Sequence, residues 1–198
     1  MEALKKAFEK NGMEVVCVSN KEEALSLAMR FIEPGMRIGL GGSTTVSQIG
    51  LLEYVTSLKG ITLFNQYEKG ITMEENTKRR REGMLSDLYI CGTNALTKNG
   101  ELVNADGSGN RVAAQIFGPK KVLIVAGRNK IVDTIEEGFK RIYNVAAPKN
   151  VERMNTTAKA MGKAPTHSMN NIGNKWAYID GDVVGRTTII LVDEDLGF

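Results

Sequence analysis

Hydrophobic positions along the chain follow two patterns, one typical of helices and one typical of buried strands. Apolar residues recur at helical spacing in residues 1–10, 21–32, 46–58, 111–118 and 131–147, and a polar helical stretch covers residues 73–82. Apolar runs rich in branched and aromatic residues occupy residues 13–19, 36–40, 61–65, 85–96, 120–127 and 187–198. Because strands alternate with helices, we predict an α/β fold with a largely parallel sheet and helices on both faces.

Turn and capping signals refine the ends of these elements. Thr45 and Gln48 have the spacing of a capping box, which predicts a helix from about Val46. Asn99-Gly100 lies between two extended runs, which predicts a tight hairpin turn. Pro148 is expected to end the long helix that begins near residue 131.

Residues 150–174 break the pattern. They lack apolar periodicity and are rich in small and polar residues, so we expect an irregular segment, either a long loop or an extra lobe. Loops of this length are usually functional or mobile. The whole chain of 198 residues, 42% of them hydrophobic, fits one domain over residues 1–198 with a sizeable core.

Charge and composition argue against several classes of function. The formal net charge is +3 with acids and bases mixed, so we expect no nucleic-acid binding, and the basic run at 77–82 is interpreted as a solvated helix face. No apolar stretch approaches the roughly 20 residues of a membrane span, and no secretory signal opens the chain. We therefore expect a cytoplasmic protein without a membrane anchor. Cys17 and Cys91 lie in strand-like runs and are interpreted as buried, reduced thiols.

A glycine-rich loop follows the strand at 36–40. Gly41 and Gly42 permit positive φ angles and close approach of a ligand, and Ser43 and Thr44 add hydroxyl donors before a helix. This pattern favours an anion such as phosphate or carboxylate. Neither the lysine of a P-loop nor the third glycine of a dinucleotide fingerprint is present, since Thr44 takes that glycine's place. The alternative is that the glycines only form a tight turn.

Two further segments follow strands and are expected to face the same crevice at the carboxyl end of the sheet. The first contributes Asn104, Asp106, Gly107, Asn110 and Arg111, of which the arginine could clamp an anion. The second contributes Arg128, Asn129 and Lys130. Alone, the first segment is also typical of an ordinary turn, and the second of solvated side chains.

No nucleophile, base and orienting group can be assembled from motif spacing. His167 is the single histidine, and no second histidine stands at metal-binding distance, so we predict no metal site. The residues by themselves indicate an anion-binding α/β domain and identify no reaction or cofactor.

Several segments together are similar to one known family. They are "GLGGSTTVSQIG" at 39–50, the stretch from Gly92 to Val132, "RIYNVAAP" at 141–148 and "VDEDLGF" at 192–198. In combination they resemble the LUD (lactate utilization) domain family, also called DUF162, over nearly the whole chain.

The resemblance implies a fold like that of the superfamily containing NagB (glucosamine-6-phosphate deaminase), ribose-5-phosphate isomerase and CoA transferases. In those relatives a similar glycine loop contacts ligand phosphate, so Gly41, Gly42, Ser43 and Thr44 are the expected anion cradle. The segment 104–111 is the expected opposite wall. Members of the family are associated with oxidation of L-lactate to pyruvate, acting beside iron–sulfur partner proteins.

One departure from the family concerns cofactors. Many similar proteins carry a cysteine cluster before the last strand, whereas residues 153–174 of this chain contain no cysteine. Ala158, Ala164, His167 and Gly173 lie at or near those places. Because thiolate ligation needs thiols, we expect no iron–sulfur cluster in this segment.

Three functions stay open. The first is an accessory protein of lactate utilisation that binds a small anionic ligand and works with iron–sulfur lactate-oxidation proteins. The second is a stand-alone sugar-phosphate or CoA-ester enzyme of the isomerase or transferase type, with Asp106 as a candidate acid or base. The third is a ligand sensor in which residues 150–174 close over an anion. A homodimer is compatible with all three.

Overall fold

The computed structural model describes all residues 1–198 and is built around a six-stranded sheet. In spatial order the strands are β1 (Glu14–Val18), β10 (Thr187–Val192), β7 (Lys121–Gly127), β4 (Leu88–Cys91), β2 (Arg37–Leu40) and β3 (Thr62–Phe64). Every neighbouring pair is parallel. Every residue of β4 and β10 is buried, as expected for central strands that are covered on both faces.

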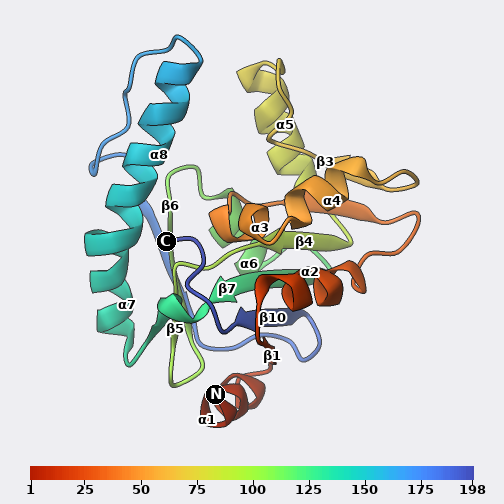
Figure 1. The fold of residues 1–198 in the computed structure, drawn as a ribbon, viewed down its shortest axis with the longest axis vertical. Helices are drawn as coiled ribbons and strands as arrows, with labels where there is room; N and C mark the ends of the chain where they lie inside the picture. Colours follow the sequence, from red (N-terminus) through yellow and green to blue (C-terminus); the bar gives the residue numbers. More distant parts are fainter.

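Helices cover both faces of this sheet, which confirms the predicted fold class (Figure 1). On one face α2 (Lys21–Met29), α3 (Thr44–Gln48) and α4 (Leu51–Ser57) pack against residues such as Ile38 and Ile190. On the other face α1 (Glu2–Lys10) and α6 (Asn110–Ile116) pack against residues such as Ile124 and Ile189. The polar helix α5 (Met73–Gly83) precedes β4.

A second, four-stranded sheet lies against the face that α1 and α6 cover, and the sequence predicted only the hairpin within it. Its order is β8 (Ile131–Val132), β5 (Ala95–Thr97), β6 (Leu102–Asp106) and β9 (Lys175–Ile179). The run 85–96, expected to form one strand, is divided between β4 in the main sheet and β5 in this one. The chain turns at 92–94, where the Asn94 amide donates to Asn104 Oδ1 over 3.0 Å.

The hairpin between β5 and β6 is confirmed. The two strands pair antiparallel, with Ala95 opposite Val103 and Leu96 opposite Leu102. Gly100 in the turn has a φ of +89°, a value that favours glycine. The turn also packs closely on α1, because a Cβ on Gly100 would lie 2.5 Å from the main-chain carbon of Ala7.

The helix predicted at 46–58 is wrong in its start and in its continuity. Ser43 is the residue that caps α3, because its Oγ accepts the Val46 amide over 3.2 Å. Thr45, the predicted cap, is buried inside the first turn. Gly50 has a φ of +79° and separates α3 from α4, so two short helices replace one.

The predicted stop at Pro148 and the irregular segment from residue 150 also need correction. After α7 (Ile135–Arg141) the chain makes a π-helical turn at η2 (Ile142–Ala146) and continues as α8 (Ala147–Ala160). Pro148 falls in the first turn of α8, where a missing amide hydrogen is tolerated. Within the segment 150–174, only residues 161–174 are irregular. Helix α8 lies at the edge of the molecule and has no buried residue (Figure 1). No helix is long and apolar enough to cross a membrane.

The two cysteines differ in exposure. Cys91 is fully buried in the central strand β4, as predicted. Cys17 is exposed, contrary to the prediction. The physical reason is its strand, because β1 is at the edge of the main sheet.

Replacing Gly100 by alanine tests the close packing of the hairpin on α1. We expect Gly100→Ala to lower the free energy of unfolding by about 2–4 kcal/mol, because the positive φ and the clash with Ala7 add together. Gly60→Ala is the matched control, since Gly60 has a φ of +80° and a Cβ there would meet no atom within 4 Å. It should cost only about 1 kcal/mol. Urea unfolding measures both variants, and an equal loss of unfolding free energy in Gly100→Ala and Gly60→Ala would contradict the packing argument.

Candidate functional site

The segments predicted to bind an anion gather at the carboxyl end of the main sheet. β4 lies between β2 and β7, so the segments that follow these three strands are neighbours. Asn104 and Arg111 bond to residues 92–94, which brings the segment 104–111 to the same place. We call this region the carboxyl-edge site and define it as residues 41–45, 92–94, 104–111 and 128–130. Two hollows of the surface lie elsewhere, one beside β1 and α2 and one along α5. The carboxyl-edge site is a cluster of polar groups.

Tyr67 fixes the glycine loop. Its hydroxyl donates to the Gly41 carbonyl over 3.2 Å and accepts the Ser43 amide over 3.0 Å. The Gly41 amide donates to the Ile90 carbonyl over 2.8 Å, which ties the loop to β4. The amide of exposed Gly42 and the hydroxyl of half-buried Thr44 have no protein partner. These two groups are the free donors of the predicted cradle.

Of the two glycines of this loop, only Gly41 is needed, and for a different reason from the one predicted. Neither Gly41 nor Gly42 has a positive φ. A Cβ on Gly41 would lie only 2.7 Å from the Cβ of Cys91, so the loop can lie against β4 only with glycine there. A Cβ on Gly42 would meet nothing closer than the Tyr67 hydroxyl at 3.8 Å. Gly41 is thus required by packing, while position 42 is open.

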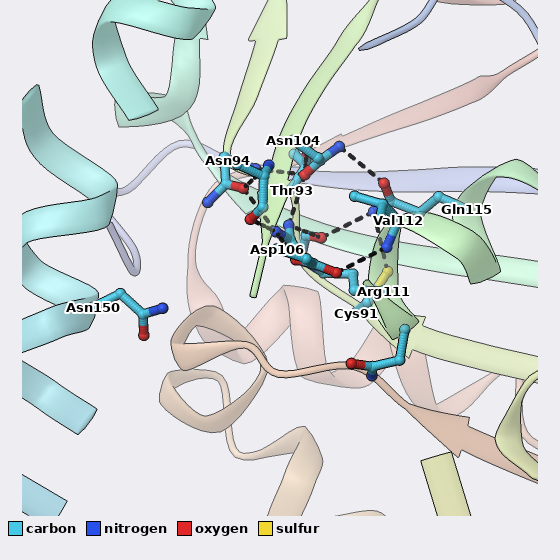
Figure 2. Close-up of polar contacts among 12 residues, drawn as sticks. Cys91, Thr93, Asn94, Asn104, Asp106, Arg111, Val112, Gln115 and Asn150 are labelled. Atoms are coloured by element: carbon cyan, nitrogen blue, oxygen red, sulfur yellow. Dashed lines mark hydrogen bonds and ion pairs between the residues drawn. The ribbon is translucent and has the colours of Figure 1, made fainter. Parts of the chain in front are cut away.

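Arg111 holds the opposite wall together (Figure 2). Its side chain comes from the start of α6, the residue is only 7% exposed, and its Nε and Nη2 donate to Asp106 Oδ1 over 2.9 and 2.6 Å. Nη1 donates to Asn104 Oδ1 over 2.6 Å and to the Gly92 carbonyl over 3.2 Å. Nη2 also donates to Asn94 Oδ1 over 2.7 Å. Every guanidinium nitrogen therefore has a protein acceptor, and in this arrangement none is free to clamp an anion.

The side chains around Arg111 extend the same network. Asn104 donates to Gln115 Oε1 over 2.9 Å, and Gln115 Nε2 lies 3.4 Å from the sulfur of Cys91. Burial raises the pKa of Cys91 to about 11, so this thiol stays protonated near neutral pH. The second oxygen of Asp106 accepts the Val112 amide over 3.0 Å. Both oxygens of the proposed acid or base are thus engaged in structural contacts.

Gly107 and Asn110 also hold the wall in place. The Gly107 carbonyl accepts Lys175 Nζ over 2.8 Å, and the neighbouring Ser108 hydroxyl accepts Arg80 Nη1 over 2.9 Å. The Asn110 amide donates to the Tyr89 hydroxyl over 3.2 Å. The loop 107–110 is therefore held by residues of β9, α5 and β4.

Lys130 is the most unusual group of the site. It belongs to η1 (Arg128–Lys130), is 3% exposed and donates to Thr45 Oγ1 over 2.8 Å. No carboxylate pairs with it. Burial lowers its pKa from 10.5 to about 7, and the positive charges of Arg141 and Arg111 contribute to that fall. Lys130 therefore exchanges its proton near physiological pH.

Residues 193–198 cover Lys130 and explain the positions of Arg128 and Asn129. Arg128 is exposed and pairs with Asp193 over 3.3 Å and with Asp195 over 3.1 Å. Asn129 Oδ1 accepts the Leu196 amide over 3.1 Å. These two residues anchor the segment 193–198, so of the three residues 128–130 only Lys130 is turned into the site.

Two more arginines lie near the site, and sequence reasoning missed both. Arg141 donates to the carbonyls of Asn129 over 3.0 Å and Asn94 over 2.5 Å. Arg153 on α8 is exposed and donates to Asn150 Oδ1 over 2.7 Å, and Figure 2 shows Asn150 projecting from α8 on the side of Asp106. Burial raises the pKa of Tyr67, and the nearby charges of Arg153 and Arg111 oppose that rise.

The electrostatic balance of the carboxyl-edge site is positive. Apart from Arg128, which pairs with Asp193 and Asp195, four cationic residues lie in the site or near it: Arg111, Lys130, Arg141 and Arg153. Of these four, only Arg111 has a carboxylate partner, Asp106. An excess of positive charge beside free backbone and hydroxyl donors is the arrangement that attracts an anion. No group of three or more His, Cys, Asp or Glu side chains is placed to hold a metal ion.

Comparison with known proteins agrees with this fold. The family model of the LUD domain matches residues 1–192. The structure is similar to the crystal structure of a DUF162 family protein from Deinococcus radiodurans, with a TM-score of 0.53 and 14% sequence identity. That likeness covers 96% of this chain and 94% of the other, and at this identity it shows the fold alone. None of the curated proteins matches the chain significantly.

The lowered pKa of Lys130 predicts a pH-dependent stability. Between pH 7 and 10.5 the unfolded chain binds more protons at this residue than the folded one, so its contribution to stability decreases as the pH falls through this window. In Lys130→Met this contribution is absent. Between pH 10 and pH 7 we expect the free energy of unfolding of the wild type to fall by roughly 1–4 kcal/mol more than that of the variant. Chemical unfolding at several pH values measures it, and a wild-type-to-variant difference that is independent of pH would contradict the assignment.

Proposed function

Because this chain belongs to the LUD domain family, we propose that it binds a small anion at the carboxyl-edge site, as an accessory protein of lactate utilisation. The observation that carries the proposal is the excess of positive charge there. Of the four cationic residues, Lys130, Arg141 and Arg153 have no carboxylate partner. Lys130 among them is buried, and burying a cation without a counter-charge is costly, so a bound anion would offset that cost.

The free donors indicate where the anion would lie. The Gly42 amide and the Thr44 hydroxyl have no protein partner, and the first turn of α3 leaves further amide hydrogens unpaired. Lys130 donates to Thr45, in that same turn. An anion at this turn would be close to the Lys130 ammonium and would favour its charged form. The proposed ligand is therefore a carboxylate or phosphate, with L-lactate and pyruvate as the first candidates.

The residues of the opposite wall take a supporting role in this proposal. Arg111 and Asp106 keep the loops 92–94 and 104–111 in place rather than contact the ligand. Arg153 on α8 supplies a cation that can turn toward the ligand, because its side chain is bonded only to its own helix neighbour Asn150.

The proposal separates binding from electron transfer. Oxidation of a 2-hydroxy acid to a 2-oxo acid releases two electrons, and these require an acceptor. Residues 153–174 contain no cysteine, so that segment offers no thiolates for an iron–sulfur cluster. In the proposed role the electrons pass to iron–sulfur partner proteins, and this chain holds the substrate or product anion.

A second candidate function is a stand-alone enzyme acting on a sugar phosphate or a CoA ester. One observation favours it: Lys130 has a pKa of about 7, so its neutral amine is available as a base near physiological pH. In this alternative Lys130, rather than Asp106, is the candidate base, because both oxygens of Asp106 are occupied.

Thermal unfolding with a panel of ligands tests the proposal. The panel holds L-lactate, pyruvate, inorganic phosphate, ribose 5-phosphate, CoA and ATP. A ligand at about a hundred times its dissociation constant adds roughly 2.7 kcal/mol, which for a chain of this length raises the melting temperature by about 5–10 °C. We expect one class of anion to give this shift, and Lys130→Met and Arg153→Ala to reduce it.

Lys120→Ala is the matched control, because Lys120 is exposed and pairs with Asp87 at the amino end of the main sheet. It should keep the full ligand-induced shift. The proposal fails if no anion stabilises the wild type, or if Lys120→Ala loses the shift as completely as Lys130→Met does. A shift by lactate or pyruvate favours the accessory role, and a shift by CoA or ribose 5-phosphate favours the enzyme.

A further inference from the structure

The outer edge of the small sheet is unpaired. β9 is the last strand in the order β8-β5-β6-β9, and it pairs only with β6, antiparallel, with Tyr178 opposite Val103. No main-chain group of residues 175–179 bonds to any other part of the chain. The strand therefore presents a row of free amide and carbonyl groups.

Aromatic side chains surround this edge. Phe139 and Trp176 contact each other edge to face, with ring centroids 5.5 Å apart and planes at 66°. The exposed fractions are 38% for Phe139, 64% for Tyr143, 46% for Trp176 and 50% for Tyr178. We call these four residues the aromatic edge patch. Large exposed aromatic groups beside an open strand are typical of protein interfaces.

The edge carries little of what keeps a strand from pairing with another chain. Such strands often carry proline, a bulge or charged side chains, lysine above all. The sequence of β9 is KWAYI, and its single charge, Lys175, is at the first position and donates to the Gly107 carbonyl. Residues 176–179 carry no feature that opposes the addition of another strand.

We propose that a second copy of this chain pairs with β9, antiparallel about a twofold axis at Ala177. The two small sheets then form one continuous sheet of eight strands. In this register Trp176 of each copy is opposite Tyr178 of the other, and the two aromatic pairs lie on the same face as Phe139. Lys175 is opposite Ile179, so no like charges meet.

A second copy is selected as the occupant because two β9 strands are complementary to each other when they pair antiparallel. Alternate residues of a strand share a face, so a twofold axis at Ala177 brings residues 176 and 178 of the two copies together on one face. The residue on the axis is small, which permits close approach of the two backbones. Directly opposed aromatic pairs stabilise antiparallel strands and favour this register over a shifted one.

The size of the patch suits a dimer. From the area that an aromatic side chain buries, the four exposed residues offer roughly 300–500 Å² for each copy. A stable interface needs about 800 Å² for each partner. The aromatic edge patch supplies about half of that area, and the paired strand with neighbouring side chains of α7 supplies the rest. The proposed dimer does not depend on the proposed ligand.

Sedimentation velocity at protein concentrations from micromolar to about a hundredfold higher tests the dimer. We expect the wild type to be a dimer at the upper concentration, and Trp176→Lys and Tyr178→Lys each to weaken association at least tenfold. Leu85→Lys is the matched control, since Leu85 is 68% exposed in the connection between α5 and β4, and it should leave the dimer unchanged. Circular dichroism must show that the variants are folded. A monomeric wild type, or a dimer that both lysine variants retain, would overturn the proposal.

A cysteine at the twofold axis gives a second readout that does not rely on weakening the interface. In a Cys17→Ser background, Ala177→Cys places two thiols opposite each other, at Cα distances of about 4.5–5.5 Å that suit a disulfide. We expect Ala177→Cys to form a covalent dimer on mild oxidation, faster than Ala160→Cys on α8. Cross-linking at position 160 that equals or exceeds that at 177 would contradict this register.

Discussion

The ion pair between Arg111 and Asp106, with the hydrogen bonds around it, is the interaction on which the carboxyl-edge site depends. The 2.6 Å contact between them joins the start of α6 to the end of β6, and the same guanidinium binds Gly92 and Asn94 in the turn between the two sheets. Removing either partner would leave a buried charge unpaired, which typically costs about 3–5 kcal/mol. One side chain, Arg111, thus fixes the positions of the main sheet, the small sheet and the loop 104–111 relative to one another.

This arrangement explains why the positive charge of the site is uncompensated. Arg111 pairs with Asp106, and Arg128 pairs with Asp193 and Asp195, so Lys130 and Arg141 are left with neutral acceptors only. The pKa of Lys130 falls to about 7 as a result of burial and of these neighbouring charges. The molecule therefore has a structural ion pair beside a group that titrates near neutrality. A bound anion would raise the pKa of Lys130 without disturbing the ion pair between Arg111 and Asp106.

The sequence predicted the layers of the fold better than it predicted the site. Apolar periodicity identified the parallel sheet and its helices, and Asn99-Gly100 identified the hairpin. Periodicity could not show that β4 and β5 belong to different sheets, because a buried strand has the same pattern in either one. Nor could it show that the π-helical turn at η2 carries the helix past Pro148, or that β9 is an edge strand. Arg111 was recognised as important, but its direction depends on acceptors in 92–94 that only the folded chain brings near. Arg153 was missed because the segment around it was expected to be irregular.

The most direct test of the uncompensated charge is the pKa of Lys130, measured by NMR on protein labelled at the lysine Cε and assigned with Lys130→Met. We predict a value near 7 for the free protein. We also predict a clear rise when the anion that stabilises the protein is added, because a bound anion favours the ammonium form. A pKa near 10.5, the ordinary value for lysine, in the free protein would contradict the claim that this cation is buried without a counter-charge. A pKa near 7 that no anion of the panel changes would place the ligand elsewhere on the molecule.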